Sequence, residues 1–431
     1  MLYYSTRDKE KKAGFALKDA AFMGLAPDGG LFIPEYIPQA DMAEVERLAE
    51  ISYADMAIYL AGLLFPGEFE QDQLEAMIRK AYDFPCPLVN MGGSKYALEL
   101  FHGPTFAFKD FGARFMGGML GLLNKSSEEL IVLTATSGDT GSAVAAGFHN
   151  VPGIKVVVLY PEGKVSNLQE SQMTTLGGNI RPVRVRGNFD DCQAMVKAVF
   201  NDKQFRSIKN ITSANSINLL RWVPQSFYYF YAWCQFKKAT GNECPDIVVP
   251  SGNYGNITAG MLAAKMGMPV RRFIAASNSN DVVPEFLNCG VYTPRPSVRT
   301  IANAMDVGAP SNFERMMYLY NEDYSELTKV LSGFSCDDAA IKEGISRIYK
   351  ESGYVSDPHS AVGNNAASYY NIDGFYLSTA HEAKFGEVIK DVLGKEFPIP
   401  EGLRKAMDKE KTFHTMDNDV EALKEYIING I

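Results

Sequence analysis

The sequence predicts an α/β protein with a mostly parallel sheet that helices cover on both faces, preceded by a mainly helical N-terminal part. From about residue 128, short runs rich in Val, Ile and Leu alternate with segments of helical periodicity. These apolar runs are nearly continuous, which is typical of parallel strands buried on both faces. Before residue 90, the hydrophobic spacing is mostly that of helices.

The N-terminal part is expected to hold two helical segments. "DMAEVERLAEISYADMAIYLAGLL" (41–64) has apolar positions at helical spacing and begins with Asp41, a candidate N-cap. "EQDQLEAMIRKAY" (70–82) repeats the pattern, and the two prolines of "DFPCPLV" (83–89) end it.

Strands and helices are then expected in alternation. The strands are expected at 129–135, 154–161, 179–185, 246–250 and 271–277. Helices are expected at 142–150, 165–177, 188–202 and 257–267, with Asn188 as a candidate N-cap of the third. Strands that are joined by helices run parallel, so these units predict a parallel sheet.

Composition excludes several function classes. The 431 residues are 46% hydrophobic and 22% charged, which is the profile of a globular protein of two or three domains. The net charge of -9, without a Lys/Arg run, argues against nucleic-acid and membrane partners. The N-terminus is too charged for a signal peptide. Scattered cysteines and histidines predict reduced thiols, a cytoplasmic location and no metal site.

One lysine lies among aromatic residues. "FHGPTFAFKDFGARF" (101–115) surrounds Lys109 with five phenylalanines. On a helix surface, such a lysine would extend past the rings to water. In an apolar pocket, desolvation would lower its pKa and leave a free amine that can attack a carbonyl. This segment alone leaves both interpretations open.

Two glycine-rich loops join a strand to a helix. "PSGNYGN" (250–256) could hold a phosphate with backbone amides, Ser251 and Asn253, and its glycines permit positive φ and close approach of the backbone. "TATSGDTGSA" (134–143) could hold a carboxylate, although Asp139 within it favours a phenol or a protonated ring nitrogen. Either loop could also be a plain structural turn.

A reactive lysine and a phosphate loop together indicate a cofactor. Pyridoxal phosphate carries an aldehyde, an aromatic ring and a phosphate, so it would use both features. The second loop is then left for a substrate carboxylate.

The order of these motifs resembles the tryptophan-synthase-like group of pyridoxal-phosphate enzymes and, within it, the threonine synthase family. The resemblance covers nearly the whole chain in family order. It includes "DGGLFIPE" (28–35), "HGPTFAFKD" (102–110), "TATSGDTG" (134–141), "NSINLLRWVPQ" (215–225), "VPSGNYGN" (249–256), "DPHSAVG" (357–363) and "STAHEAKF" (378–385).

The resemblance implies the fold of the tryptophan synthase β-subunit, with two open, mostly parallel sheets flanked by helices and a mainly helical N-terminal domain. We expect that N-terminal domain at 1–90. We expect the large cofactor-binding domain at 91–127 and 241–431, and a smaller α/β domain at 128–240.

The family's site residues map onto this chain by motif. Lys109 resembles the lysine that carries the cofactor as an aldimine and acts as the catalytic base. The cofactor's phosphate loop would comprise Ser251, Gly252, Asn253, Gly255 and Asn256. Thr379 would bind the pyridine nitrogen, and Asp139 stands where most relatives place an Asn against the phenolic oxygen. The substrate would be bound by Ser137, Thr140, Asn215, Ser216 and Arg221, the last three holding its phosphate.

The activity implied is conversion of O-phospho-L-homoserine and water to L-threonine and phosphate, by a monomer or homodimer. A serine/threonine dehydratase on the same fold would not need Asn215, Ser216 and Arg221. A catalytically silent relative is the other alternative. His102 is expected to be structural, and His359 and His381 to line the site without an assigned role.

Overall fold

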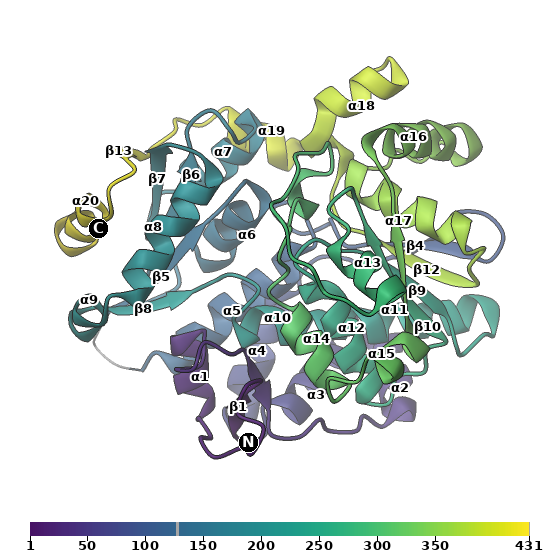
Figure 1. Ribbon diagram of the computed structural model, residues 1–431, viewed down its shortest axis with the longest axis horizontal. Helices are drawn as coiled ribbons and strands as arrows, with labels where there is room; N and C mark the ends of the chain where they lie inside the picture. The colour runs from purple at the N-terminus through teal and green to yellow at the C-terminus, as the bar shows by residue number, and fades with distance from the viewer. Residues whose placement is uncertain (126–128, 431) are drawn as a thin grey trace.

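The computed structural model describes residues 1–125 and 129–430, and its framework is a pair of mostly parallel sheets (Figure 1). The large sheet has the strand order β11-β10-β9-β12-β4-β3, and only the β3–β4 pair is antiparallel. Its strands are β3 (Leu88–Asn90), β4 (Lys95–Glu99), β9 (Asp246–Pro250), β10 (Arg272–Ser277), β11 (Leu331–Ser335) and β12 (Gly374–Ser378).

The small sheet is parallel throughout, in the order β13-β7-β6-β5-β8. Its strands are β5 (Leu130–Ala135), β6 (Ile154–Pro161), β7 (Ile180–Arg186), β8 (Asn210–Ser213) and β13 (His414–Asp417). The five strands expected from the sequence are thus β5, β6, β7, β9 and β10, and the two-sheet α/β fold is confirmed.

Helices cover both faces of each sheet, as the continuous apolar strands predicted. In the small sheet, Val156 and Val158 face the main core, whereas Val157 and Leu159 face a second core with α8 (Phe189–Asn201). In the large sheet, α16 (Asp338–Ser352) and α17 (Pro358–Tyr369) supply the outer core. Five further helices lie between consecutive strands in the chain. They are α5 (Lys109–Leu123), α6 (Asp139–Phe148), α7 (Asn167–Thr174), α11 (Ser226–Thr240) and α12 (Gly255–Lys265).

The N-terminal part is mainly helical, with one short antiparallel pair of strands, β1 (Tyr3–Ser5) and β2 (Phe32–Pro34). Its helices are α1 (Leu17–Met23), α2 (Met42–Ile51), α3 (Tyr53–Leu64) and α4 (Gln71–Ala81). Asp41 caps α2 as expected, but the helix expected over 41–64 is two helices. Ser52 is extended, with φ of -166°, and its hydroxyl caps α3 by accepting from the Asp55 amide.

The remaining helical segments connect the strands. They are α9 (Lys203–Ile208), α10 (Leu219–Trp222), η1 (Val223–Gln225), α13 (Val282–Cys289), η2 (Asn303–Met305), α14 (Phe313–Leu319), α15 (Tyr324–Val330), η3 (Glu382–Phe385), α18 (Gly386–Leu393), α19 (Glu401–Met407) and α20 (Val420–Asn429). Asn188 caps α8 in a reciprocal capping box with Asp191. No helix in the described ranges is long and apolar enough to cross a membrane.

The C-terminal segment corrects the expected domain division. We expected 241–431 to lie wholly in the large domain, but β13 pairs with β7 of the small sheet and α20 packs on α8 (Figure 1). Met416 and Leu423 fill the same apolar core as Met195, so this segment is held by burial. The boundary expected at 127/128 lies outside the described residues.

The expected site residues lie in loops that follow strands of the two sheets, or in the first turn of the helices after those loops. The loops that carry them follow the carboxyl ends of β4, β5, β8, β9 and β12. In open α/β sheets, ligands bind at these strand ends.

Candidate active site

Lys109 is the first residue of α5, ten residues after β4 ends. Its side chain is 16% exposed, and its Nζ lies 5.0 Å from the centroid of the Phe108 ring. Burial lowers the pKa of Lys109, and the nearby cations Lys384 and Arg221 lower it further. The structure therefore favours the pocket interpretation over the solvated one.

Two other phenylalanines of the motif, Phe111 and Phe106, pack against other aromatic rings. Phe111 belongs to an aromatic cluster with Tyr53, Phe84 and Tyr228, on the core side of α5. Phe106 packs edge-on against His381. Among the described residues, Phe108 supplies the ring that contacts the Lys109 ammonium.

A buried carboxylate holds the loop that precedes Lys109. The buried Asp110 carboxylate accepts hydrogen bonds from the Thr105 amide (2.8 Å) and hydroxyl (2.7 Å). Burial raises the pKa of Asp110 to about 6. Phe106 has a φ of 57°, in the left-handed region that a non-glycine residue rarely adopts. The loop is therefore held in a fixed and strained shape.

Thr379 adjoins this loop. Its carbonyl accepts from the Phe108 amide (2.9 Å) and its amide donates to the Ser360 hydroxyl (2.9 Å). Within the described residues, the hydroxyl of Thr379 makes no hydrogen bond. The backbone is thus fixed next to Lys109 while the hydroxyl stays available to a ligand.

Asp139 opens α6 and faces two lysines. Its Oδ1 accepts from Lys384 Nζ (2.7 Å) and Gln169 Nε2 (2.9 Å), and its Oδ2 lies 4.0 Å from Lys109 Nζ. Burial alone would raise the pKa of Asp139. The two lysines outweigh burial and hold that pKa well below its usual range. Asp139 is therefore an anion, and Lys384 is its closest charged partner.

Ser137 and Thr140 flank Asp139 at the same helix start. Thr136 Oγ1 accepts from the amides of Gly138 (2.9 Å) and Gly141 (2.8 Å), which fixes the loop. The amides of Ser137, Asp139 and Thr140 have no hydrogen-bond partner among the described residues. Ser137 is exposed, so these groups suit an anion that arrives from solvent.

The 251–256 loop presents a row of free amides. The amides of residues 252–256 form no hydrogen bonds within the described parts of the chain, whereas those of Ser251 and Ile257 do. Ser251 Oγ donates to Asn256 Oδ1 (2.7 Å), which closes the loop on itself. Consecutive free amides at a helix start bind phosphate.

The conformation of this loop corrects one expectation. Neither glycine has a positive φ; Tyr254 does, at 61°. Gly252 is required by packing instead, because a Cβ there would lie 2.6 Å from the Met305 Cα. His359 holds that neighbouring segment, since its Nε2 accepts from the Ala304 amide (3.1 Å) and its Nδ1 bonds to Asp357.

The 215–221 segment lies against two parts of the site. Ser216 Oγ accepts from the side-chain amides of Asn253 and Asn312, so it borders the 251–256 loop. Asn215 Oδ1 accepts from Thr134 Oγ1 (2.7 Å), beside the second loop.

Arg221 packs on α5. A Cβ on Gly112 would lie 3.2 Å from the Arg221 Nε. Arg221 is 4% exposed, and among the described residues it forms no close ion pair, although the charge of Asp110 acts on it. Its Nη1 donates to the Ala214 carbonyl, while its Nε is buried without a partner. Burial lowers the pKa of Arg221 to about 10, which leaves it charged at neutral pH.

Known proteins match the chain over its full length. The model of pyridoxal-phosphate dependent enzymes matches residues 90–383, and those of the threonine synthase N terminus and C-terminal part match 2–82 and 360–427. Threonine synthase from Haemophilus influenzae is 41% identical over 100% of both chains. The chain belongs to the threonine synthase family.

Solved threonine synthases share the fold. The Escherichia coli structure aligns with a TM-score of 0.91 at 39% identity, over 100% of both chains. A pyridoxal-phosphate-bound threonine synthase from Brucella melitensis aligns with a TM-score of 0.93 at 32% identity, over 99% of this chain and 98% of its own.

Residues of this threonine synthase family member fit pyridoxal phosphate on structural grounds. A desolvated amine (Lys109), a free hydroxyl beside it (Thr379) and a row of free amides (252–256) match the aldehyde, the ring nitrogen and the phosphate. Sequence reasoning missed Lys384 and Gln169, which bind Asp139. Lys384 lies in the quoted motif "STAHEAKF", and the unexplained charge of Asp139 was the signal that could have found it.

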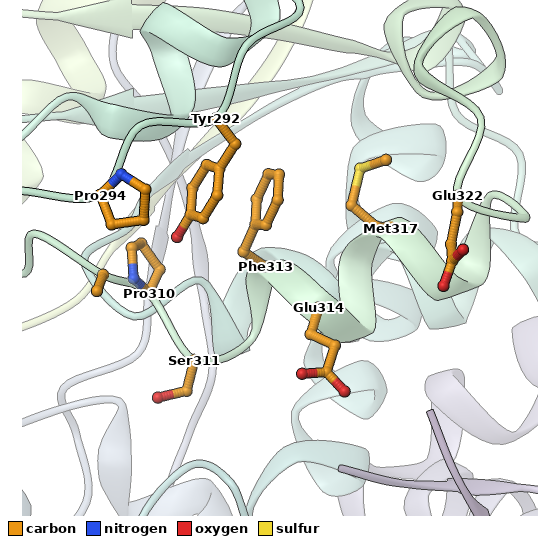
Figure 2. Close-up of a pocket in the computed structure, with 9 residues that line it drawn as sticks. Tyr292, Pro294, Pro310, Ser311, Phe313, Glu314, Met317 and Glu322 are labelled. Carbon is orange, nitrogen blue, oxygen red and sulfur yellow. The ribbon is translucent and has the colours of Figure 1, made fainter. Parts of the chain in front are cut away.

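A surface cavity of about 540 Å³ lies apart from these residues (Figure 2). Figure 2 shows the Tyr292 and Phe313 rings side by side in it, Glu314 below them and Glu322 at its other end. Arg7 and Lys9 pair with those two carboxylates. One lining residue, Ser311, contacts the site through its amide, which donates to Asn253 Oδ1 (2.6 Å), and we assign the cavity no catalytic part.

Proposed function

We propose that this protein converts O-phospho-L-homoserine and water to L-threonine and phosphate, with Lys109 as the residue that carries the cofactor. The observation that carries the proposal is Arg221, a buried cation without a carboxylate partner in the described chain. A buried charge without a close counter-ion is costly, so it favours an anionic ligand. A phosphorylated amino acid supplies that anion close to Lys109.

The chain's own groups divide the work. Bound pyridoxal phosphate would supply an electron sink for charge that develops on the substrate carbons. It would be held by Ser251, Gly252, Asn253, Gly255 and Asn256 at the phosphate, Thr379 at the ring nitrogen and Asp139 near the phenolic oxygen. Lys109 Nζ, whose pKa is lowered by burial, would accept the proton from substrate Cα and return protons later in the reaction.

The substrate would be bound at both ends. Its carboxylate would accept hydrogen bonds from Ser137, Thr140 and the free amides at the start of α6. Its phosphate would be held by Arg221 together with Asn215 and Ser216. Because the guanidinium is a planar fork of donors, it suits a phosphate dianion better than a lysine would.

We also propose that the protein acts in the cytoplasm as a monomer or homodimer on this small-molecule substrate. All six cysteines are free, which suits a reducing compartment. Light scattering of the purified protein at several concentrations would give the oligomeric state.

The assay follows threonine and phosphate together. The purified protein, loaded with pyridoxal phosphate, should release phosphate and form threonine in equal amounts from O-phosphohomoserine. Formation of a 2-oxo acid and ammonia from threonine, without threonine synthesis, would instead indicate a dehydratase. No turnover of either substrate by correctly loaded protein would indicate the silent relative.

A further inference from the structure

Lys384 is a buried lysine whose role no motif assigned. Its side chain is 0% exposed, and its Nζ donates to Asp139 Oδ1 (2.7 Å) and to the Thr105 carbonyl (2.8 Å). It therefore ties three segments together: η3 after β12, the start of α6, and the loop that ends at Lys109. An ammonium this deeply buried needs such partners.

The two oxygens of Asp139 are used differently. Oδ1 is occupied by Lys384 and Gln169, whereas Oδ2 makes no hydrogen bond in the described chain and lies 4.0 Å from Lys109 Nζ. Asp139 is thus the closest anion to both lysines, and it is hydrogen-bonded to only one of them. Without Lys384, Lys109 would be the one remaining cation within 4.0 Å of Asp139 among the described residues.

We propose that Lys384 is a positioning residue that keeps the Lys109 amine reactive by binding Asp139 as its own counter-ion and by placing a second positive charge beside Lys109. The proposal rests on the proposed role of Lys109 as the reactive amine. Lys384 would act on Lys109 through the Asp139 carboxylate. Lys384 Nζ bonds to Asp139 Oδ1, and Asp139 Oδ2 lies 4.0 Å from Lys109 Nζ.

The charges around Lys109 support this assignment. Asp139 on α6 and Asp357 before α17 favour the ammonium form of Lys109, whereas Lys384 on η3 and Arg221 on α10 disfavour it. Asp110 follows Lys109 on α5, but its carboxylate is turned to Thr105. Burial lowers the pKa of Lys109 first, and the charge of Lys384 adds to that effect. The position of Lys384 is therefore suited to tune this pKa.

The test measures the Lys109 pKa directly in the full-length chain freed of cofactor. Trace labelling with acetic anhydride across a pH series, followed by peptide mass spectrometry, gives the apparent pKa of each lysine. Lys384→Met should raise the Lys109 pKa by at least about one unit, and so slow its labelling at neutral pH about tenfold. Lys384→Arg keeps the charge and should stay close to the unmodified protein.

A second variant keeps the test decisive if Lys384→Met does not fold. Asp139→Asn removes the anion while Lys384 remains, so the Lys109 pKa should fall. The double variant Asp139→Asn/Lys384→Met removes a buried pair together, which proteins often tolerate. Its Lys109 pKa should lie between those of the two single variants.

The matched control is Lys237→Met. Lys237 is also ion-paired, with Glu46 (2.8 Å) and Glu243 (3.0 Å), but it lies on α11 and is outside the site. It should leave the Lys109 pKa unchanged. If folded Lys384→Met and Asp139→Asn proteins also leave it unchanged, Lys384 is only a structural cross-link and the proposal is wrong. Threonine synthesis by the unmodified protein is measured separately, so failure of the proposed function would be distinguishable.

Discussion

Replacing Arg221 by Met separates a phosphate-binding role from a structural one. Methionine keeps much of the length of the side chain and removes the charge. Among the described residues, the Arg221 guanidinium donates one hydrogen bond, to the Ala214 carbonyl, and its Nε has no partner. Losing that bond costs about 1 kcal/mol, and relief of an unpaired buried charge offsets it. The free energy of unfolding should therefore change little.

The loss in catalysis should be much larger. A charge-assisted contact to a phosphate is worth roughly 2–5 kcal/mol when one partner is removed. That range corresponds to a decrease in kcat/KM for O-phosphohomoserine of roughly 30- to 5,000-fold. Arg221→Lys should fall between the two proteins, because it keeps the charge but loses the planar fork.

The assay compares two substrates in the same preparations. Phosphate release reports turnover of O-phosphohomoserine, and 2-oxo acid formation reports slow side reactions with serine or threonine, which bring no phosphate. Arg221→Met should impair the first reaction and leave the second nearly unchanged, with little change in melting temperature. Equal loss of both reactions would show that Arg221 is structural, and the phosphate site would have to be sought elsewhere.

Three further outcomes are expected. Lys109→Ala should abolish turnover, and borohydride reduction of the loaded unmodified protein should attach the cofactor to the Lys109 peptide; attachment at Lys384, the second buried lysine, would contradict the assignment. Gly252→Ala should lower the melting temperature of the cofactor-free protein because its Cβ would meet the Met305 backbone, whereas at Gly255 the nearest atom is 3.3 Å away and the change should be mild. Equal melting temperatures would refute this packing argument. Burial raises the pKa of Glu382 to about 7, so the folded state binds more protons than the unfolded state between about pH 4.5 and 7. Stability from this group is lost as pH rises through that window. Glu382→Gln should therefore gain stability relative to the unmodified protein between pH 4.5 and 7.5 in thermal unfolding, and a constant difference would contradict it.

The sequence predicts features that depend on neighbouring residues. The strands and the loop after β9 follow from the local hydrophobic pattern. The caps at Asp41 and Asn188 are local too, because each side chain binds a backbone amide within three residues of itself. The sequence did not predict the break between α2 and α3 at Ser52, because both segments have the same helical hydrophobic spacing. The Ser52 cap is the feature that separates the two helices.

Features that depend on residues far apart in the sequence could not be predicted from local sequence patterns. Pairing of β13 with β7 joins residues about 230 positions apart, and nothing in "HTMD" specifies which sheet it enters. The positive φ at Tyr254 instead of a glycine has the same origin. The Tyr254 side chain is buried and its hydroxyl hydrogen-bonds to the Ser277 hydroxyl, so tertiary packing holds a conformation that local preference disfavours.

The Asp139–Lys384 pair shows most clearly where local reasoning ends. An acidic residue is unexpected in an anion-binding loop, because its charge would repel the anion. Here the charge of Asp139 is balanced by a lysine 245 positions further along the chain. The β12–η3 connection carries both Thr379 and Lys384, so it brings a hydroxyl and an ammonium to the same place. A variant with Asn at 139 and the original lysine at 384 would bury an uncompensated cation. We therefore expect tolerated substitutions at these two positions to occur together, as the neutral double variant would demonstrate.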